Sequence, residues 1–147
     1  MTDIHHRIGV VTPSTDDVYA ALTTIDGLAG WWTTDTHGDP ELGGKLEFRF
    51  PQGGFDMEVL ELTPGERVRW RVTDGPVEWI GTTVDWRLSR NDGYTIVNFA
   101  HEGWAEPVEF LSHCSTKWAV FLLSLKDLVE KGRGAPAPDD VAISDWH

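Results

Sequence analysis

The segment Val108–Lys131, VEFLSHCSTKWAVFLLSLKDLVEK, carries the most regular pattern in this chain of 147 residues. Its apolar side chains recur at helical spacing, with Phe121 and Leu128 at the flank of one stripe. The stripe consists of Leu111, Cys114, Trp118, Leu122, Leu125 and Val129. Pro107 precedes the segment and Gly132 follows it, and a glycine is a common helix terminator. The pattern predicts one long amphipathic helix.

A series of strand-like segments precedes this helix. Five segments alternate apolar and polar residues with period two, and sequences typical of tight turns separate them. These segments are Lys45–Phe50, Phe55–Leu62, Arg67–Thr73, Val77–Leu88 and Tyr94–His101. This order of strands and turns predicts an antiparallel meander.

The N-terminal part adds one more strand and a short helical region. Ile4–Thr12 alternates loosely and predicts a half-buried strand, whereas Ser14–Ile25 has helical spacing. Gly27 and Gly30 interrupt the helical pattern, so we expect one or two short helices. Thr33–Gly44 has no periodicity and is expected to be a long loop.

Together these elements predict an α+β domain over residues 1–132, in which a six-stranded curved antiparallel sheet surrounds the long C-terminal helix. Residues 133–147 are rich in Ala, Pro and Asp and are expected to be a tail. We expect this tail to pack on the domain or on a neighbour through Trp146.

The alternation within the meander predicts which side chains face the helix. The inward set is Leu46, Phe48, Phe50, Phe55, Met57, Val59, Val68, Trp70, Val72, Val84, Trp86, Leu88, Thr95, Val97, Phe99 and His101. The opposite set carries most of the charges and is expected to be a solvated outer face: Lys45, Glu47, Arg49, Asp56, Glu58, Arg67, Arg69, Arg71, Asp85, Arg87 and Asn98.

Charge and composition exclude several classes of partner. The formal net charge of −12 and the lack of a basic stripe argue against nucleic acid and anionic membrane surfaces. The longest apolar run, Trp118–Leu125, falls far short of the ~20 residues of a membrane-spanning helix, so no membrane insertion is expected. The first residues show no apolar stretch or small-residue cleavage site, so secretion is not expected, and the single cysteine excludes an intramolecular disulfide. A cytoplasmic location is the expectation.

The aromatic content is high, with eight Trp and six Phe. These large side chains either fill the space between sheet and helix completely or line an apolar cavity there. The sequence leaves both arrangements open.

Three stretches resemble one known family: Ile8–Trp32, IGVVTPSTDDVYAALTTIDGLAGWW; Tyr94–Trp104, YTIVNFAHEGW; and His113–Gly132, HCSTKWAVFLLSLKDLVEKG. They are similar to the activator of heat-shock-protein-90 ATPase homologue family, within the START-like (SRPBCC) superfamily. The resemblance implies a helix-grip fold around an apolar cavity. Superfamily members include lipid carriers, hormone-binding proteins, polyketide aromatase/cyclases and co-chaperone domains, so fold alone does not define the activity.

Reactive side chains form no recognisable catalytic or metal motif. His101, Glu102, His113 and Cys114 lie close in sequence, but their spacing directs them apart, so neither a metal site nor a cofactor is expected. Cys114 with His101 would be a nucleophile pair, but no third residue orients it, and the sequence favours a buried structural cysteine.

Binding is therefore the leading hypothesis, with a small apolar or aromatic molecule, lipid-like or polyketide-like, as the partner. His101 is the inward polar group best suited to anchor it, although a structural histidine at a strand end is the simpler interpretation. The candidate cavity walls are Trp31, Trp32, Phe48, Trp70, Trp86, Phe99, His101, Trp104, Cys114, Trp118 and Phe121. A cyclase- or hydrolase-type enzyme and a chaperone-associated interaction module are the alternatives, and a homodimer is a candidate assembly.

Overall fold

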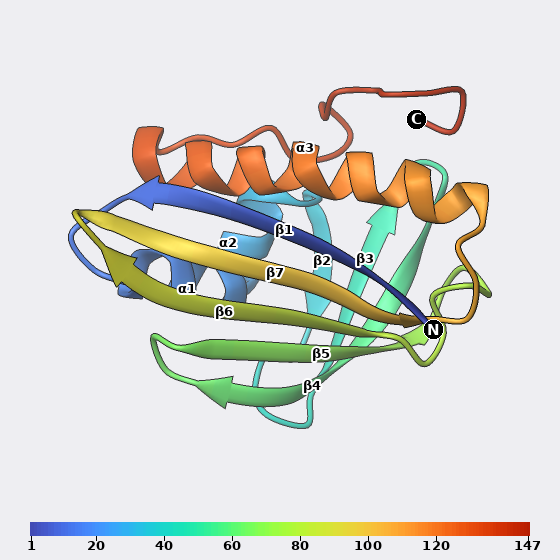
Figure 1. The fold of residues 1–147 in the computed structure, drawn as a ribbon, viewed down its shortest axis with the longest axis horizontal. Helices are drawn as coiled ribbons and strands as arrows, with labels where there is room; N and C mark the ends of the chain where they lie inside the picture. The colour runs from blue at the N-terminus through green and yellow to red at the C-terminus, as the bar shows by residue number, and fades with distance from the viewer.

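A computed structural model describes residues 1–147 as one sheet with three helices. The elements in chain order are β1 (Thr2–Val11), α1 (Asp16–Thr23), α2 (Ile25–Trp31), β2 (Asp35–Gly38), β3 (Lys45–Phe50), β4 (Gly53–Thr63), β5 (Arg67–Asp74), β6 (Thr83–Asn91), β7 (Tyr94–Trp104) and α3 (Glu109–Lys131). The strand order is β1-β7-β6-β5-β4-β3-β2, and all neighbours are antiparallel. The sheet curves along α3 (Figure 1).

The predicted α+β class, curved sheet and C-terminal helix are confirmed, but the prediction of six strands is wrong because the sheet has seven. The additional strand, β2, lies within the expected loop Thr33–Gly44. It pairs with β3 from Asp35↔Arg49 to Gly38↔Leu46, and Thr36 is buried. A strand this short has no measurable alternation, and its conformation depends on hydrogen bonds to a partner strand.

The strand predicted over Val77–Leu88 is also shorter than expected. β6 begins only at Thr83, and the residues before it form turns that end at Gly81, whose φ is 85°. The backbone therefore folds back before β6, and this turn brings Trp79 into the interior with 5% of its surface exposed.

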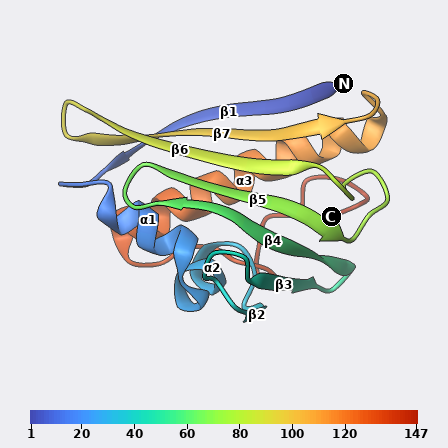
Figure 2. The ribbon, with the colours of Figure 1, turned by 90° about the horizontal axis from the view of Figure 1, so that it is seen from below.

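Helix α3 packs against the inner face of the sheet through the predicted stripe. Cys114, Trp118, Leu122 and Leu125 are buried, and Gly132 terminates the helix in a left-handed conformation. Helices α1 and α2 lie at the end of the molecule away from the N-terminal half of α3 (Figures 1 and 2). No helix is long and apolar enough to span a membrane.

The free edge of β1 is occupied by side chains of α3. Lys126 Nζ donates to the carbonyl oxygen of Gly9 at 2.6 Å, and the amide of Val11 donates to Glu130 Oε2 at 2.8 Å. Lys126 and Glu130 also pair with each other at 2.6 Å. Two main-chain groups of this edge are therefore satisfied by the helix.

The outer face is charged, as predicted, but two of its carboxylates are not solvated. Asp85 is only 3% exposed, because Arg67 contacts both of its oxygens at 3.0 Å and Arg87 contacts one of them at 3.1 Å. Asp56 is 9% exposed and accepts from Arg49 at 2.8 Å. The expectation that these two residues are solvated is wrong, since planar guanidinium groups from neighbouring positions cover them.

The tail after α3 folds back on the domain. The amide of Ala137 donates to the Trp32 carbonyl at 2.8 Å, and the amide of Thr34 donates to the Ala137 carbonyl at 3.0 Å. Ala135 is held by Ser124 Oγ at 2.7 Å. From there the chain runs over α3 (Figure 1).

Candidate functional site

A pocket of about 560 Å³ opens at one end of the inner face. Five segments surround it: the C-terminal end of α2 with Trp32, the turn from β3 to β4, the segment from β5 to β6, the N-terminal part of α3, and the tail. Nine apolar side chains line it: Trp32, Phe50, Phe55, Trp79, Phe110, Cys114, Trp118, Phe121 and Trp146. The polar lining side chains are Gln52, Asp74, His113, Lys117, Asp140 and His147.

Four of the eleven predicted cavity residues line this pocket: Trp32, Cys114, Trp118 and Phe121. The other seven lie in the packed core and do not reach the pocket: Trp31, Phe48, Trp70, Trp86, Phe99, His101 and Trp104. Aromatic side chains thus fill most of the space between sheet and helix, and a pocket remains at one end. The structure combines the filled core and the cavity between which the sequence did not decide.

Stacked aromatic rings fill the closed part. The Trp32 ring lies parallel to Trp31 at 5.4 Å and to Trp70 at 6.0 Å, and it also contacts Trp118 at 5.1 Å. The Trp118 ring in turn packs on Phe99 at 4.5 Å. Trp32 and Trp118 therefore have one side in the core and the other at the pocket.

His101 is completely buried and has both ring nitrogens engaged. The indole N–H of Trp118 can only donate, so Nδ1 of His101 accepts it at 3.1 Å and the ring proton is on Nε2. Nε2 lies 2.8 Å from Thr82 Oγ1, whose hydroxyl donates to the Trp79 carbonyl at 2.5 Å. Burial lowers the pKa of His101 to about 3, with a small opposing effect of Asp3. The hydrogen bonds of this neutral histidine link β7 to Trp118 on α3 and to Thr82 in the segment between β5 and β6. Neither ring nitrogen is free to bind a ligand in the pocket.

Cys114 lines the pocket, and its thiol is protonated near pH 7. Burial raises its pKa to about 12, outweighing a smaller opposing effect of Trp79. A protonated thiol is a poor nucleophile and a poor metal ligand. No group of three or more His, Cys, Asp or Glu side chains is arranged to hold a metal ion.

Trp79 is the main pocket residue that sequence reasoning missed. Its ring stacks on Trp118 at 6.0 Å with an interplanar angle of 12°, and its edge meets the His101 ring at 4.7 Å. Its indole N–H is buried, has no oxygen or nitrogen acceptor, and has the weakly accepting sulfur of Cys114 as its polar neighbour. The flanking Pro76 and Gly81 were the available signal, because they interrupt the strand to which Trp79 was assigned.

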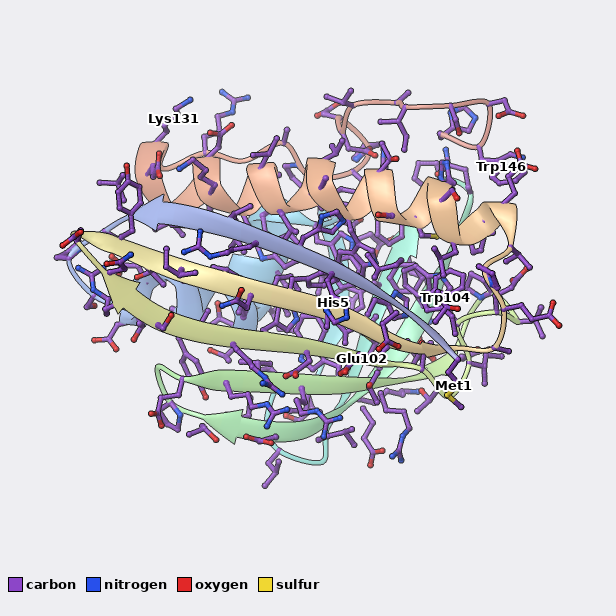
Figure 3. The ribbon with its side chains drawn as sticks, in the orientation of Figure 1. Met1, His5, Glu102, Trp104, Lys131 and Trp146 are labelled. Carbon is purple, nitrogen blue, oxygen red and sulfur yellow. The ribbon has the colours of Figure 1, made fainter.

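The pocket opening is formed partly by polar contacts between α3 and the tail. Lys117 Nζ lies 2.5 Å from Asp140 Oδ2, and Ser144 Oγ lies 2.8 Å from His113 Nδ1. Trp146 lies beside the N-terminal half of α3 in Figure 3 and packs edge-on against Phe110 and His113. The expected packing of the tail through Trp146 is therefore on this domain.

A curved antiparallel sheet that holds a long C-terminal helix, with an aromatic pocket between them, defines a START-like helix-grip protein. The family model described as "Activator of Hsp90 ATPase homolog 1-like protein" matches residues 13–130. The chain belongs to this family, as its sequence predicted.

Solved structures agree with this assignment. The Aha1 dimer from Colwellia psychrerythraea is similar at 45% identity with a TM-score of 0.84, covering 91% of this chain and 100% of that one. CalU16 from Micromonospora echinospora shares the fold at 22% identity and a TM-score of 0.79, covering 97% of this chain and 74% of that one. DynU16, from the dynemicin biosynthetic locus, shares the fold at 23% identity with a TM-score of 0.73, covering 90% of this chain and 48% of that one. No curated protein sequence matches.

Proposed function

We propose that this protein binds a small hydrophobic or aromatic molecule, lipid-like or polyketide-like, in the pocket between the sheet and α3. The observation that carries the proposal is the pocket of about 560 Å³ with nine apolar lining side chains. Ligand sites are typically concave, largely apolar and roughly 300–1,000 Å³ in volume. We also propose the cytoplasm as its location.

The pocket wall is suited to a flat, ring-containing ligand. The parallel indoles of Trp79 and Trp118 offer faces and edges against which aromatic rings stack favourably. The N–H of Trp79, whose polar neighbour is only the weakly accepting sulfur of Cys114, is a hydrogen-bond donor within a largely apolar wall. Burying a donor that has no strong acceptor costs free energy, and an oxygen or nitrogen acceptor on a ligand would recover part of it.

A fluorescence titration tests the proposal. N-phenylnaphthylamine, a neutral fluorophore that brightens in apolar surroundings, is expected to bind the native protein and raise its melting temperature. Phe55→Ala is expected to weaken binding about fivefold, because roughly 40 Å² of apolar contact is lost. Tyr94→Ala is the matched control, since Tyr94 is an exposed aromatic residue at the opposite end of β7. No uptake and no thermal shift would refute a binding pocket.

The enzyme alternative has less support. His101 and Cys114, the pair on which it depended, are respectively locked in a hydrogen-bond network and protonated. Ser144 contacts His113 near the opening, but Ser144 already accepts from the Trp146 amide, and it does not line the pocket. Hydroxyl activation needs a base that is itself oriented by a third group, and His113 has no such hydrogen-bond partner.

The homodimer and chaperone-associated hypotheses have one specific observation in their favour. The solved Aha1 relative, 45% identical over 91% of this chain, is described as a dimer. Light scattering after size-exclusion chromatography tests the assembly directly. A mass of about 33 kDa, twice that of the 16.5 kDa chain, supports a homodimer, and the monomer mass at high concentration refutes it.

A further inference from the structure

The last part of the tail, residues 139–147, forms one side of the pocket. Asp140, Trp146 and His147 are among the lining residues, and the segment lies over the N-terminal half of α3 (Figures 1 and 3). Its contacts with the helix are few. They consist of the aromatic packing of Trp146, the Ser144 hydroxyl on His113, and the contacts of Lys117.

Lys117 is the only cationic Lys or Arg side chain in the pocket lining, and all its hydrogen-bond acceptors come from the tail. Nζ contacts Asp140 Oδ2 at 2.5 Å, the Val141 carbonyl oxygen at 2.5 Å and the main-chain oxygen of His147 at 2.8 Å. An ammonium group has three donors, so the tail satisfies all of them. The Lys117 side chain is only 15% exposed, and Nζ also lies 5.3 Å from the centre of the Phe121 ring.

The tail thus places a carboxylate on Lys117 and an aromatic ring at the opening of the same pocket. A partly buried ammonium that loses its counter-ion is costly, so whatever displaces Asp140 must supply a negative charge. A neutral ligand would not supply that charge. An aromatic acid supplies both groups in one molecule.

We propose that the pocket is selective for aromatic molecules that carry an anionic group, and that residues 139–147 occupy part of their site until they bind. The ligand's anionic group takes the place of the Asp140 carboxylate on Lys117, and its ring system enters beside Trp118. This inference rests on the proposed binding function and adds the ligand class and a displaceable segment.

The other charged groups of the pocket are compatible with an anion at Lys117. Asp74 is the last residue of β5, and its carboxylate accepts from the Gly75 amide at 2.9 Å. His113 faces Lys117, and burial followed by the Lys117 charge lowers the pKa of His113, so it is neutral near pH 7. His113 therefore neither repels nor replaces Lys117.

Two variants of the full chain test the proposal, because both break the same ion pair but only one keeps the cation. Asp140→Asn removes the counter-ion and weakens the hold of the tail while keeping the Lys117 cation, whereas Lys117→Gln removes both the charge and the contacts of Nζ with the tail. The probes are N-phenylnaphthylamine and its anionic counterpart, anilinonaphthalene sulfonate. Asp139→Asn controls for the change in net charge, since Asp139 is an exposed neighbour outside the pocket lining.

We expect Asp140→Asn to tighten binding of the sulfonate probe about tenfold, because a larger fraction of molecules has an accessible site. Lys117→Gln is expected to leave that probe at or below its wild-type affinity while improving the neutral probe as much as Asp140→Asn does. Hydrogen exchange at the amides of residues 141–147 is expected to speed up when the sulfonate probe binds wild-type protein.

Equal gains for the sulfonate probe in both variants would overturn the role of Lys117. Unchanged binding of both probes in both variants would overturn displacement of the tail. If the neutral probe binds no variant at all, the proposed binding function itself fails, and this inference fails with it. Normal binding of the neutral probe with no preference for the anion overturns this inference alone.

Discussion

The two ends of the inner face use the same kinds of side chain and reach different outcomes. At one end, α2 inserts Trp31 and Trp32 between the sheet and α3, and Trp31 packs edge-on against Trp86 at 5.6 Å. At the other end Trp32 packs on Phe50 and Phe55 from one side only, and these two residues stay partly exposed around the pocket. Aromatic content alone therefore does not decide between a filled core and a cavity. The two ends differ in whether a further ring, such as Trp31 on Trp86, fills the space between sheet and helix.

The largest expected effect lies at the boundary between the two ends. Trp118→Ala is expected to lower the free energy of unfolding by about 3–5 kcal/mol, as a large-to-small change in a filled core. It also leaves Nδ1 of His101 without its donor. Urea unfolding measures the loss. Leu123→Ala, on the exposed side of the same helix, is the control and should change stability by less than about 0.5 kcal/mol. A stable Trp118→Ala protein would mean that the boundary is not packed as described.

Cys114 sharpens the comparison, because it lines the pocket at the open end and yet is buried enough for its pKa to be raised. A pKa of about 12 against 9.0 for an unperturbed thiol leaves about a thousandfold less thiolate. Alkylation by iodoacetamide at about pH 8 is therefore expected to be at least about a hundredfold slower in native protein than in urea. Similar rates in the two states would show that solvent reaches the thiol through the pocket.

Buried His101, at the filled end, is expected to make the free energy of unfolding depend on pH. His101 has a pKa of about 3 in the folded protein and its ordinary value of 6.5 when unfolded. Below pH 6.5 the unfolded chain therefore binds a proton that the folded chain does not. Stability falls as pH decreases toward 3, by about 1.4 kcal/mol per pH unit well inside this window.

Urea titrations at about pH 7 and about pH 5 measure this slope, and His101→Gln is the matched variant because it cannot take up the proton. The carboxylates titrate in both proteins, so the difference between their slopes belongs to His101. Parallel slopes would contradict a neutral, fully desolvated histidine.

The smallest effect on stability is expected at the open end. Trp146 is 45% exposed and packs only at the edges of Phe110 and His113, so Trp146→Ala should cost less than about 1 kcal/mol. Differential scanning calorimetry detects a loss of this size. A loss comparable to that of Trp118→Ala would show that the tail is an integral part of the core.

Much of the fold could be predicted from the sequence because period-two alternation survives in every long strand. All side chains assigned inward are buried, except Phe50 and Phe55, which are partly buried beside the pocket. The buried stripe on α3 was predictable because apolar residues recur along this long helix with the helical period of about 3.6 residues. β2 and the turn before β6 were not predictable in this way, because each depends on hydrogen bonds to a neighbouring strand and not on an alternation of its own.

The candidate site was predicted less completely than the fold. Alternation tells which face a side chain belongs to, but not how far along that face the packing continues. Trp86 and Phe99 were therefore assigned to the same cavity as Trp118 and Phe121, although Trp31 packs on Trp86, Trp118 packs on Phe99, and neither Trp86 nor Phe99 reaches the pocket. Lys117 and Asp140 could not be paired from sequence, because nothing in the composition of the tail indicates where it folds back.

The side chains of α3 on β1 have a consequence for how copies of this protein can meet. A strand at the end of a sheet exposes main-chain donors and acceptors that can recruit a strand from another molecule, which is a common beginning of fibril growth. Lys126 and Glu130 already occupy Gly9 and Val11 at this end. The opposite end, β2, has only four residues and ends at Gly38. Association by adding strands to this sheet is therefore disfavoured on both sides, so two copies that associate should meet through helices or loops.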